Sequence, residues 1–229
     1  MTKPKLSLII PTYNERENLP ELVRRIHTSL KEIEYQLIIV DDNSPDETGI
    51  LAEKLAKKYP IMVIHRKKRG LASAIVDGFR NAKSELLCVM DADLQHPPEK
   101  IIDLLKKVKN VDLVIASRYI NRSSVKGLNL WRRITSEIAK ALAQAFFPSI
   151  RRIKDPLSGF FILKKNVINK IELKAIGYKI LLEILVKGRY KNVVEIPYIF
   201  GKRKMGKNKL SFVEYLNYLK CLFILKFNR

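Results

Sequence analysis

The sequence predicts an α/β fold in which a doubly wound, mostly parallel sheet carries helices on both faces. Two observations predict it. Over the first 117 residues, apolar runs of four to six residues alternate with longer amphipathic stretches, and polar clusters follow several of these runs. Short apolar runs bounded by turn residues are typical of parallel strands buried on both faces. With 229 residues, of which 47% are hydrophobic, the chain can bury a sizeable core, so we expect one domain over residues 1–229.

The pattern also predicts the individual elements of this first part. The apolar runs predict strands over residues 6–10, 36–40, 61–65, 85–90 and 112–117. The stretches between them predict helices over residues 16–32, 46–58, 70–82 and 98–109. Two helix starts carry capping-box residues, from Asn14 to Glu17 and from Ser44, at the N-cap before Pro45, to Glu47.

The alternation weakens after residue 117. Residues 127–147 place apolar side chains close to the helical period and predict one long amphipathic helix. A turn leading into a strand is expected over residues 155–163, followed by a helix over 178–190 and a strand over 192–200.

The segment over residues 212–227 is rich in aromatic and aliphatic side chains. Glu214 and Lys220 interrupt it, and no apolar run of the chain reaches the roughly 20 residues that span a bilayer. Together with residues 127–147, the segment is a candidate for an amphipathic helix lying in a membrane interface. Ordinary packing against the domain is an equally open alternative for both.

The positive charge of the chain is confined almost entirely to its second half. The net charge is +21, of which residues 1–117 carry +2 and residues 118–229 carry +19. Such an asymmetry indicates an anionic partner for the second half, which could be nucleic acid, an acidic membrane surface or a phosphorylated substrate. A merely solvated basic surface is the alternative.

The cysteines and the N-terminus indicate a reducing compartment. Cys88 and Cys221 cannot make a disulfide framework, and the start of the chain lacks the longer apolar region of a signal peptide. We therefore expect a cytoplasmic protein.

Polar residues crowd the ends of three predicted strands, where an open parallel sheet binds its ligands. They are Thr12, Tyr13, Asn14 and Glu15 after the first strand, Asp41 and Asp42 after the second, and residues 91–95 after the fourth.

The segment "CVMDADLQHPPEK" (88–100) is the most informative of these strand ends. If extended geometry persists beyond the apolar run, Asp91, Asp93 and Gln95 point to one side. Two carboxylates and an amide carbonyl are hard oxygen donors suited to Mg2+ or Mn2+. A strand-end cap and turn is the alternative for the two aspartates, and His96 is interpreted as a turn residue. Because carboxylates are costly to gather, the nearby pair at 41–42 favours the cation site.

Six segments, in this order and spacing, resemble the family 2 glycosyltransferases with the Rossmann-like GT-A fold. They are "PTYNE" (11–15), "VDDNSPDET" (40–48), "DADLQHPPE" (91–99), "ASRY" (116–119), "WRRITS" (131–136) and "DPLSGFF" (155–161). Within that group they are most similar to dolichyl-phosphate mannose synthases and related polyprenyl-phosphate hexosyltransferases. A departure is the segment "RKMGKNKL" (203–210), where Asn208 stands in place of the usual serine.

The resemblance implies a nucleotide-sugar-binding half over residues 1–117. Its pocket would be lined by Pro11, Tyr13, Glu15, Asp41 and Asp42, with one aspartate of that pair near the base. The cation, Mg2+ or Mn2+, would be held against the donor diphosphate by Asp91, Asp93 and Gln95.

The resemblance further implies a basic half over residues 118–229 that faces the acceptor and the membrane. The phosphates of donor and acceptor would be bound by Arg118, Arg132, Ser136 and Arg203. Of these, Arg203 would serve the nucleotide sugar, and the other three the acceptor phosphate. Asp93, Arg118 and Arg132 are the residues expected to be catalytic. Independently, Arg132 and Ser136 lie four residues apart on one predicted helix face and could grip phosphate oxygens together.

The reaction implied is transfer of a hexose from a nucleotide sugar to a polyprenyl phosphate with inversion. An acceptor phosphate is already anionic near neutral pH and needs no strong general base, in keeping with the lack of an evident catalytic histidine or activated serine. Mannose from GDP-mannose and dolichyl phosphate are favoured, and glucose from UDP-glucose is the nearest competitor. Asp155 and Glu183 are candidate contributors near the sugar, and a structural role in a turn or helix is an equally open alternative for each.

Two other functions are open at this stage. A glycosyltransferase with a non-lipid acceptor would need a carboxylate base, because a hydroxyl must lose its proton. A non-catalytic basic module that binds nucleic acid or membrane would account for the charge but not for residues 91–95. We therefore expect a membrane surface, and not nucleic acid, as a partner. The site would lie at the cytoplasmic face, and a membrane-anchoring subunit is a further candidate partner.

Overall fold

The computed structural model describes residues 4–67, 70–120, 130–201 and 212–227. For residues 130–133 and 212–215 it describes the backbone alone.

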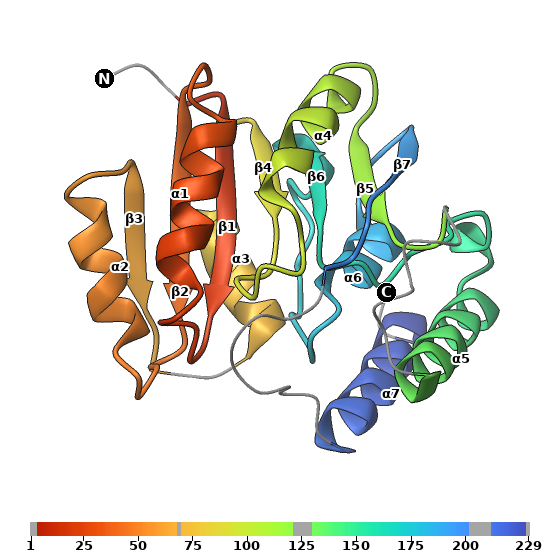
Figure 1. Cartoon of the computed structure of the whole chain (residues 1–229). Coiled ribbons are helices and arrows are strands. Elements are labelled where there is room, and N and C mark those ends of the chain that lie inside the picture. Colours follow the sequence, from red (N-terminus) through yellow and green to blue (C-terminus); the bar gives the residue numbers. More distant parts are fainter. Residues whose placement is uncertain (1–3, 68–69, 121–129, 202–211, 228–229) are drawn as a thin grey trace.

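A seven-stranded sheet forms the centre of the molecule, in the order β3-β2-β1-β4-β6-β5-β7 (Figure 1). Its strands are β1 (Leu6–Thr12), β2 (Tyr35–Asp41), β3 (Ile61–His65), β4 (Leu86–Val89), β5 (Leu113–Ser117), β6 (Phe161–Lys164) and β7 (Val193–Pro197). All neighbours pair in parallel except β6, which is antiparallel to both β4 and β5. The predicted strands are confirmed, and the one entered from the 155–160 turn is the strand that reverses direction.

Helices cover both faces of this sheet, as predicted. They are α1 (Leu19–Ser29), α2 (Thr48–Ala56), α3 (Leu71–Asn81), α4 (Ile101–Val108), α5 (Leu130–Phe146), α6 (Ile180–Lys187) and α7 (Phe212–Phe227). Successive strand residues point to opposite faces, so Leu8 belongs to the apolar cluster that includes α1, α2 and α4, while Ile9 belongs to the cluster that includes α3, α6 and α7. The core is therefore two apolar layers with the sheet between them.

Two helix starts differ from the capping-box prediction. α2 begins at Thr48, four residues after Ser44, and Glu47 at its N-cap has a positive φ of 63°. The reason is that the Ser44 hydroxyl donates to Asp41 at 2.5 Å, so it does not cap the helix. α1 begins only at Leu19, because Asn14 adopts a left-handed φ of 53° and continues the loop.

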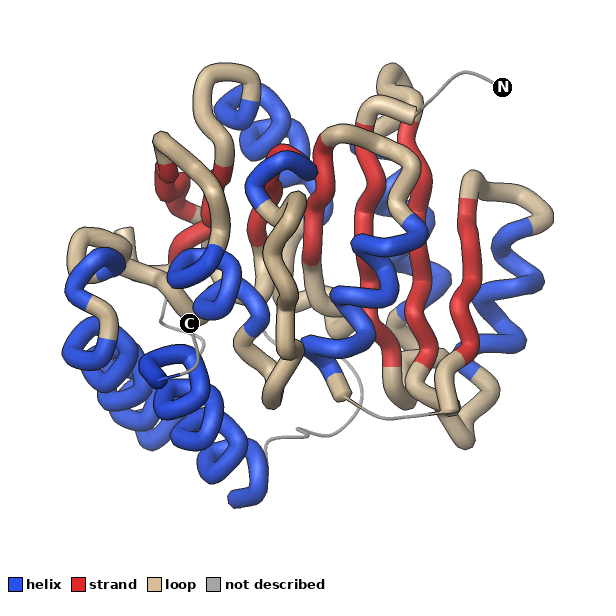
Figure 2. The backbone as a smooth tube through the Cα atoms, turned by 180° about the vertical axis from the view of Figure 1, so that it is seen from behind, coloured by secondary structure: helices blue, strands red, loops and turns tan. Residues whose placement is uncertain are grey.

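Helices α5 and α7 lie side by side, toward the edge of the sheet at which β1 and β2 end (Figures 1 and 2). The Tyr218 hydroxyl of α7 donates to the Ala139 carbonyl of α5 at 2.6 Å, and the rings of Phe146 and Phe223 meet edge to face. Large apolar side chains remain exposed on both helices: Ile134, Ile138, Leu216, Leu219, Phe223 and Phe227. Among the described residues, no helix has both the length and the apolar content needed to cross a bilayer.

Close packing of α3 on β1 generates a stability prediction. A Cβ added at Gly78 would lie 2.4 Å from Cγ2 of Ile9, a β-branched side chain with little freedom to move. Gly78→Ala should therefore lower the free energy of unfolding by about 1–3 kcal/mol, measured by urea titration. Arg80→Ala, on the exposed side of the same helix, is the control and should have a smaller effect. Equal stability of Gly78→Ala and wild type would contradict the packing described here.

Candidate functional site

The candidate site lies along the edge of the sheet where the parallel strands end. The loops that follow β1, β2, β4, β5 and β7 meet at this edge, and the 155–160 loop that precedes the antiparallel β6 joins them. This is the position at which an open parallel sheet binds ligands. The predicted site residues before residue 119 are thus brought to one edge.

Asp41 ties the end of β2 to its neighbours. Its carboxylate, 2% exposed, accepts hydrogen bonds from the Thr12 hydroxyl at 3.0 Å, the Ser44 hydroxyl and the Ser44 N–H. One donor at the end of β1 and two donors in the loop after β2 hold the carboxylate in place. Asp41 therefore shapes the loop that follows β2 through contacts within the chain.

Asp42 faces a different set of donors. It accepts from Nη1 of Arg66 at 2.7 Å and from the Gly70 N–H at 2.7 Å, which joins the end of β2 to the start of α3. Burial raises the pKa of Asp42, and the Gly70 N–H and the Arg66 charge offset only part of that effect. Like Asp41, Asp42 is engaged by the chain itself.

The three other residues predicted to line the nucleotide pocket differ in exposure. Pro11 lies inside β1 in register with Val40 and is buried, whereas Tyr13 is partly exposed at the strand end. Glu15 is buried and accepts from the Asn18 side chain at 2.7 Å. Of this group, Tyr13 presents the most side-chain surface to the edge.

Asp91, Asp93 and Gln95 are partly exposed, but their segment does not keep the extended geometry on which their predicted convergence depends. β4 ends at Val89, and Leu94 has a positive φ of 61°, so the segment is a turn and not an extension of the strand. Burial nevertheless alternates, with these three side chains partly exposed and Ala92, Leu94 and His96 buried between them. The convergence of the three side chains stays a prediction, and the turn is stabilised where Asp93 accepts from the Gln95 N–H at 3.1 Å.

The amide of Gln95 has a defined orientation. Its Nε2 donates to the Gly201 carbonyl at 3.0 Å, and the Gly201 N–H donates to the Gln95 carbonyl at 2.8 Å. Because a carbonyl can only accept, the NH2 group must face Gly201. The amide oxygen is therefore the atom that remains for a ligand.

His96 is a buried residue of the site and not only part of a turn. It is 2% exposed, stacks on Phe160 and meets Tyr198 and Phe200 edge to face. Its Nδ1 accepts the Asp91 N–H at 3.2 Å. Burial lowers the pKa of His96 to about 4, so the ring is neutral at pH 7 and carries its proton on Nε2.

Arg118 and Asp155 form a buried, bidentate ion pair at the end of β5. Nε and Nη2 of Arg118 donate to the two carboxylate oxygens at 2.9 and 2.8 Å, and the Arg118 N–H donates to the same carboxylate. Asp155 is 1% exposed. Burial alone would raise the pKa of Asp155, but the charge and hydrogen bonds of Arg118 outweigh it and lower that pKa. A substrate phosphate would have to meet Arg118 at its remaining edge, Nη1.

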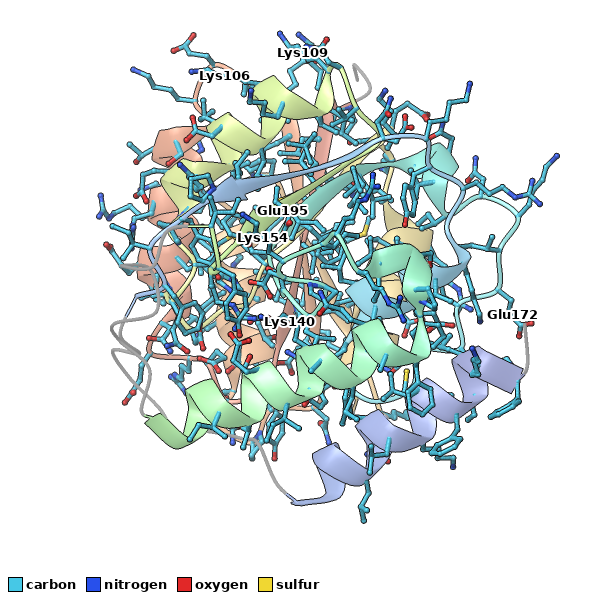
Figure 3. All side chains as sticks on the ribbon, turned by 90° about the vertical axis from the view of Figure 1, so that its right-hand side faces the viewer. Lys106, Lys109, Lys140, Lys154, Glu172 and Glu195 are labelled. Carbon is cyan, nitrogen blue, oxygen red and sulfur yellow. The ribbon has the colours of Figure 1, made fainter. Side chains whose placement is uncertain are left out.

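Glu195 of β7 supports the ion pair between Arg118 and Asp155. The backbone N–H groups of Lys154 and Asp155 each donate to the Glu195 carboxylate of β7 at 2.8 Å, and Figure 3 shows Lys154 and Glu195 side by side. Glu195 thus positions the loop that carries Asp155.

The remaining predicted phosphate ligands are placed only in part. The Ser136 hydroxyl lies 2.7 Å from that of Tyr119, the residue after Arg118, which brings α5 to the end of β5. The ammonium of Lys140 lies over the Tyr119 ring, 4.2 Å from its centroid. Of Arg132 only the backbone is described, one helical turn before Ser136, while Arg203 and Asn208 lie outside the described residues.

Comparison with known proteins places this site in a family. The model of the glycosyl transferase family 2 matches residues 7–171. This chain belongs to glycosyl transferase family 2. Over 221 residues it is 48% identical to a dolichol-phosphate mannosyltransferase of Pyrococcus furiosus, which covers 96% of this chain and 63% of that relative. The chain therefore spans less than two thirds of the length of this relative.

Two further relatives agree with this family 2 assignment, and a solved structure agrees with the fold. The chain is 35% identical to a dolichol-phosphate mannosyltransferase of Saccharomyces cerevisiae, covering 96% of this chain and 88% of the relative. It is 37% identical to a polyprenol monophosphomannose synthase of Mycolicibacterium smegmatis, covering 89% and 80%. Glucosyl-3-phosphoglycerate synthase of Mycobacterium tuberculosis has a TM-score of 0.72 at 18% identity, over 97% of this chain and 79% of that chain. The predicted GT-A fold is confirmed.

Two further residues at this edge, Lys179 and Tyr198, were not predicted from the sequence to belong to the site. Lys179 precedes α6 and donates from Nζ to the Leu157 carbonyl at 3.1 Å. Tyr198 follows β7 and is 4% exposed, and its buried hydroxyl has no hydrogen-bond partner among the described residues. Neither belongs to a quoted motif, and only the pairing of distant segments brings them here.

Glu183, a candidate contributor near the sugar, stabilises the loop before α6. It is buried and accepts from the N–H groups of Lys174 and Ala175 and from Nζ of Lys187. These contacts fix the loop before α6, where Ala175 has a positive φ of 53°. Asp155, the other candidate, is at the site but is paired with Arg118.

The buried ion pair generates a prediction for this family 2 glycosyltransferase. Asp155→Asn should lower the free energy of unfolding by about 3–5 kcal/mol, because it leaves the Arg118 charge without its partner. Asp103→Asn, at an exposed pair with Lys100, is the control and should change stability far less. Urea unfolding at pH 7 measures both.

The stability difference between wild type and Asp155→Asn should depend on pH in a defined direction. The folded-state pKa of Asp155 is lowered, so its stabilisation is present above the usual aspartate pKa of about 3.9 and is lost as the pH falls through the lower, folded value. The stability gap between wild type and Asp155→Asn should therefore narrow below about pH 4. A gap that widens in acid would contradict the assignment.

Proposed function

We propose that this protein transfers mannose from GDP-mannose to a polyprenyl phosphate, dolichyl phosphate among them, with inversion and with the aid of a divalent cation. The observation that carries the proposal is the pair of partly exposed carboxylates, Asp91 and Asp93, on the edge that also holds Arg118. The substrate class rests on the relatives, which are named as dolichol-phosphate mannosyltransferases and a polyprenol monophosphomannose synthase. A second candidate, transfer of glucose from UDP-glucose, uses the same site.

The residues at 91–95 fit a divalent cation. Asp91 and Asp93 keep exposed surface, and the Gln95 amide presents its oxygen because its nitrogen is bound to Gly201. Within the described part of the chain, no group of three or more His, Cys, Asp or Glu side chains could hold a metal ion. Mg2+ commonly binds through one or two carboxylates together with waters and substrate phosphates, which matches two aspartates and a diphosphate. A neighbour in fold, the mycobacterial glucosyl-3-phosphoglycerate synthase, was crystallised with Mn2+ and UDP-glucose.

In the proposed mechanism, the chain aligns two phosphorylated substrates and neutralises their charge. A bound Mg2+ or Mn2+ would supply the charge that stabilises the departing nucleoside diphosphate. Asp91 and Asp93 would hold that cation, and His96 fixes the backbone of Asp91 because its Nδ1 accepts the Asp91 N–H. Arg118, anchored by Asp155, offers Nη1 to a phosphate oxygen, and Arg132 and Ser136 of α5 would complete the grip on the acceptor.

No residue is required to remove a proton in this mechanism. The acceptor is a phosphate monoester whose second pKa is about 6, so its oxygen is anionic near neutral pH. Asp155 could not serve as a free base because both of its oxygens accept from Arg118. A hydroxyl acceptor would need such a base, which favours the lipid phosphate.

The nucleotide would occupy the ends of β1 and β2. Tyr13 has exposed surface there, while Asp41 and Asp42 hold the loops that border the pocket. The proposal therefore assigns Tyr13 to direct contact and the two aspartates to the shape of the pocket, with Pro11 and Glu15 behind them.

A membrane surface is part of the proposal, at its cytoplasmic face. Residues 118–229 carry a net charge of +19, and each Lys or Arg near an anionic surface contributes roughly 1 kcal/mol of attraction. Helices α5 and α7, which carry these exposed apolar side chains, lie toward the same side as the strand ends (Figure 1). They would bring the site to the headgroup of a lipid phosphate, and a membrane-anchoring subunit could reinforce that contact.

A substrate screen tests the proposed activity. GDP-mannose and UDP-glucose are each incubated with a polyprenyl phosphate, with and without Mg2+ or Mn2+, and lipid product and released nucleotide are recorded. Mannosyl lipid and GDP, formed only with a cation, are expected. Product from UDP-glucose alone would select the second candidate, and equal transfer to a peptide or free sugar would exclude the lipid phosphate as the specific acceptor.

Asp93→Asn should lower kcat roughly 100-fold or more, because a neutral amide would hold less firmly the cation that neutralises the leaving diphosphate. The substitution keeps Oδ1, which accepts from the Gln95 N–H, so the turn is retained. Asp103→Asn, on the exposed side of α4, should retain wild-type kcat. Full metal-dependent transfer by Asp93→Asn would remove this residue from the cation site.

Ile138→Gln should weaken binding to vesicles of anionic phospholipid roughly tenfold, because Ile138, 54% exposed on α5, would lose its insertion into the interface. Ile50→Gln is a matched control, since Ile50 is 47% exposed on α2. Vesicle co-sedimentation measures both. The opposite ranking of the two variants would place the membrane contact elsewhere.

A further inference from the structure

Lys179 is held in a fixed position next to the 155–160 loop. Its Nζ donates to the Leu157 carbonyl at 3.1 Å, and the ammonium lies over the Tyr178 ring at 4.6 Å. The residue immediately precedes α6, so its backbone is set by the start of that helix. Lys179 is partly exposed.

The same loop brings Lys179 to the charged groups of the site. Leu157 lies between Asp155, the partner of Arg118, and Gly159, where an added Cβ would come within 3.0 Å of the Asp91 carboxylate. The charges of Arg118, Asp91 and Asp155 all act on the ammonium of Lys179. Lys179 therefore stands among the groups that the proposed function assigns to phosphates and cation.

The ammonium of Lys179 has a carbonyl but no carboxylate as its partner. Within the described residues it makes no ion pair, and the nearby Asp155 is bound in bidentate fashion by Arg118. Burial lowers the pKa of Lys179 to about 8, the neighbouring Arg118 adds to that effect, and Asp91 and Asp155 offset part of it. A cation held away from water is costly without an anion, and it becomes favourable when an anionic ligand enters.

We propose that Lys179 binds a phosphate oxygen of the substrates, acting beside Arg118. An ammonium has three N–H donors, and the Leu157 carbonyl takes one of them, so two can reach a ligand. The phosphate could belong to the diphosphate of the donor or to the monoester of the acceptor, since both present the same oxygens. This assignment rests on the proposed function for the choice of ligand and on the contacts of Lys179 for its position.

Three variants separate this role from a structural one. Lys179→Gln removes the charge but keeps an N–H donor for the Leu157 carbonyl, and Lys179→Arg keeps the charge. Lys165→Gln is the matched control, because Nζ of Lys165 also donates to a carbonyl, that of Ala82, at the opposite edge of the sheet. Binding of GDP, UDP and geranyl phosphate is measured by calorimetry with Mg2+, together with kcat, the KM of each substrate and the midpoint of thermal unfolding.

Lys179→Gln should weaken binding of either the nucleotides or geranyl phosphate roughly tenfold or more, with a matching rise in one KM and an unchanged unfolding midpoint. Lys179→Arg should recover most of the affinity, and Lys165→Gln should behave as wild type. The ligand whose binding is lost identifies the source of the phosphate.

Unchanged affinity of Lys179→Gln for all three ligands would overturn the proposal. A lower unfolding midpoint without recovery by Lys179→Arg would also overturn it, in favour of a structural role at Leu157. The binding affinities and the unfolding midpoint can be measured whether or not the proposed activity is found. If the wild type formed no mannosyl lipid yet bound GDP or geranyl phosphate, the binding series would still decide the role of Lys179.

Discussion

The buried ion pair between Arg118 and Asp155 is the interaction on which the rest of the site depends. It joins the end of β5 to the loop that enters β6, and Glu195 of β7 holds the same loop through two backbone N–H groups. Strands β5, β6 and β7 are thereby joined through the carboxylates of Asp155 and Glu195. Because both charges are shielded from water, their attraction is strong only while the bidentate geometry is kept, and that geometry leaves Nη1 of Arg118 for a ligand.

Burial divides the aspartates of the site into two groups with different roles. Asp41 and Asp42 are buried and accept hydrogen bonds from the chain, whereas Asp91 and Asp93 are partly exposed in a turn. Carboxylates that the fold has already satisfied shape a pocket, and carboxylates that retain exposed surface can bind a cation. The same residue type therefore serves the architecture at one strand end and the proposed chemistry at another.

The placement of α5 and α7 connects the charge of the second half to the site. The contact of Tyr119 with Ser136 brings α5 to the end of β5, and Tyr218 attaches α7 to α5. This helix pair, which carries exposed apolar side chains, lies toward the side on which the strands end (Figure 1). An enzyme with a lipid phosphate as acceptor needs that arrangement, because the headgroup stays at the membrane surface while the sugar donor arrives from water.

The sequence by itself determined the sheet, the flanking helices and the segments that carry the site, because burial on both faces requires apolar runs and strand ends expose polar residues. It also pointed to Asp91, Asp93 and Gln95 through their alternate spacing. Only the tertiary structure decided that Ser44 binds Asp41 and does not cap α2, that Asp42 is taken by Arg66, and that Lys179 reaches the site through Leu157. These outcomes depend on which distant groups become neighbours, and hydrogen bonds between such groups leave no periodic pattern in the chain.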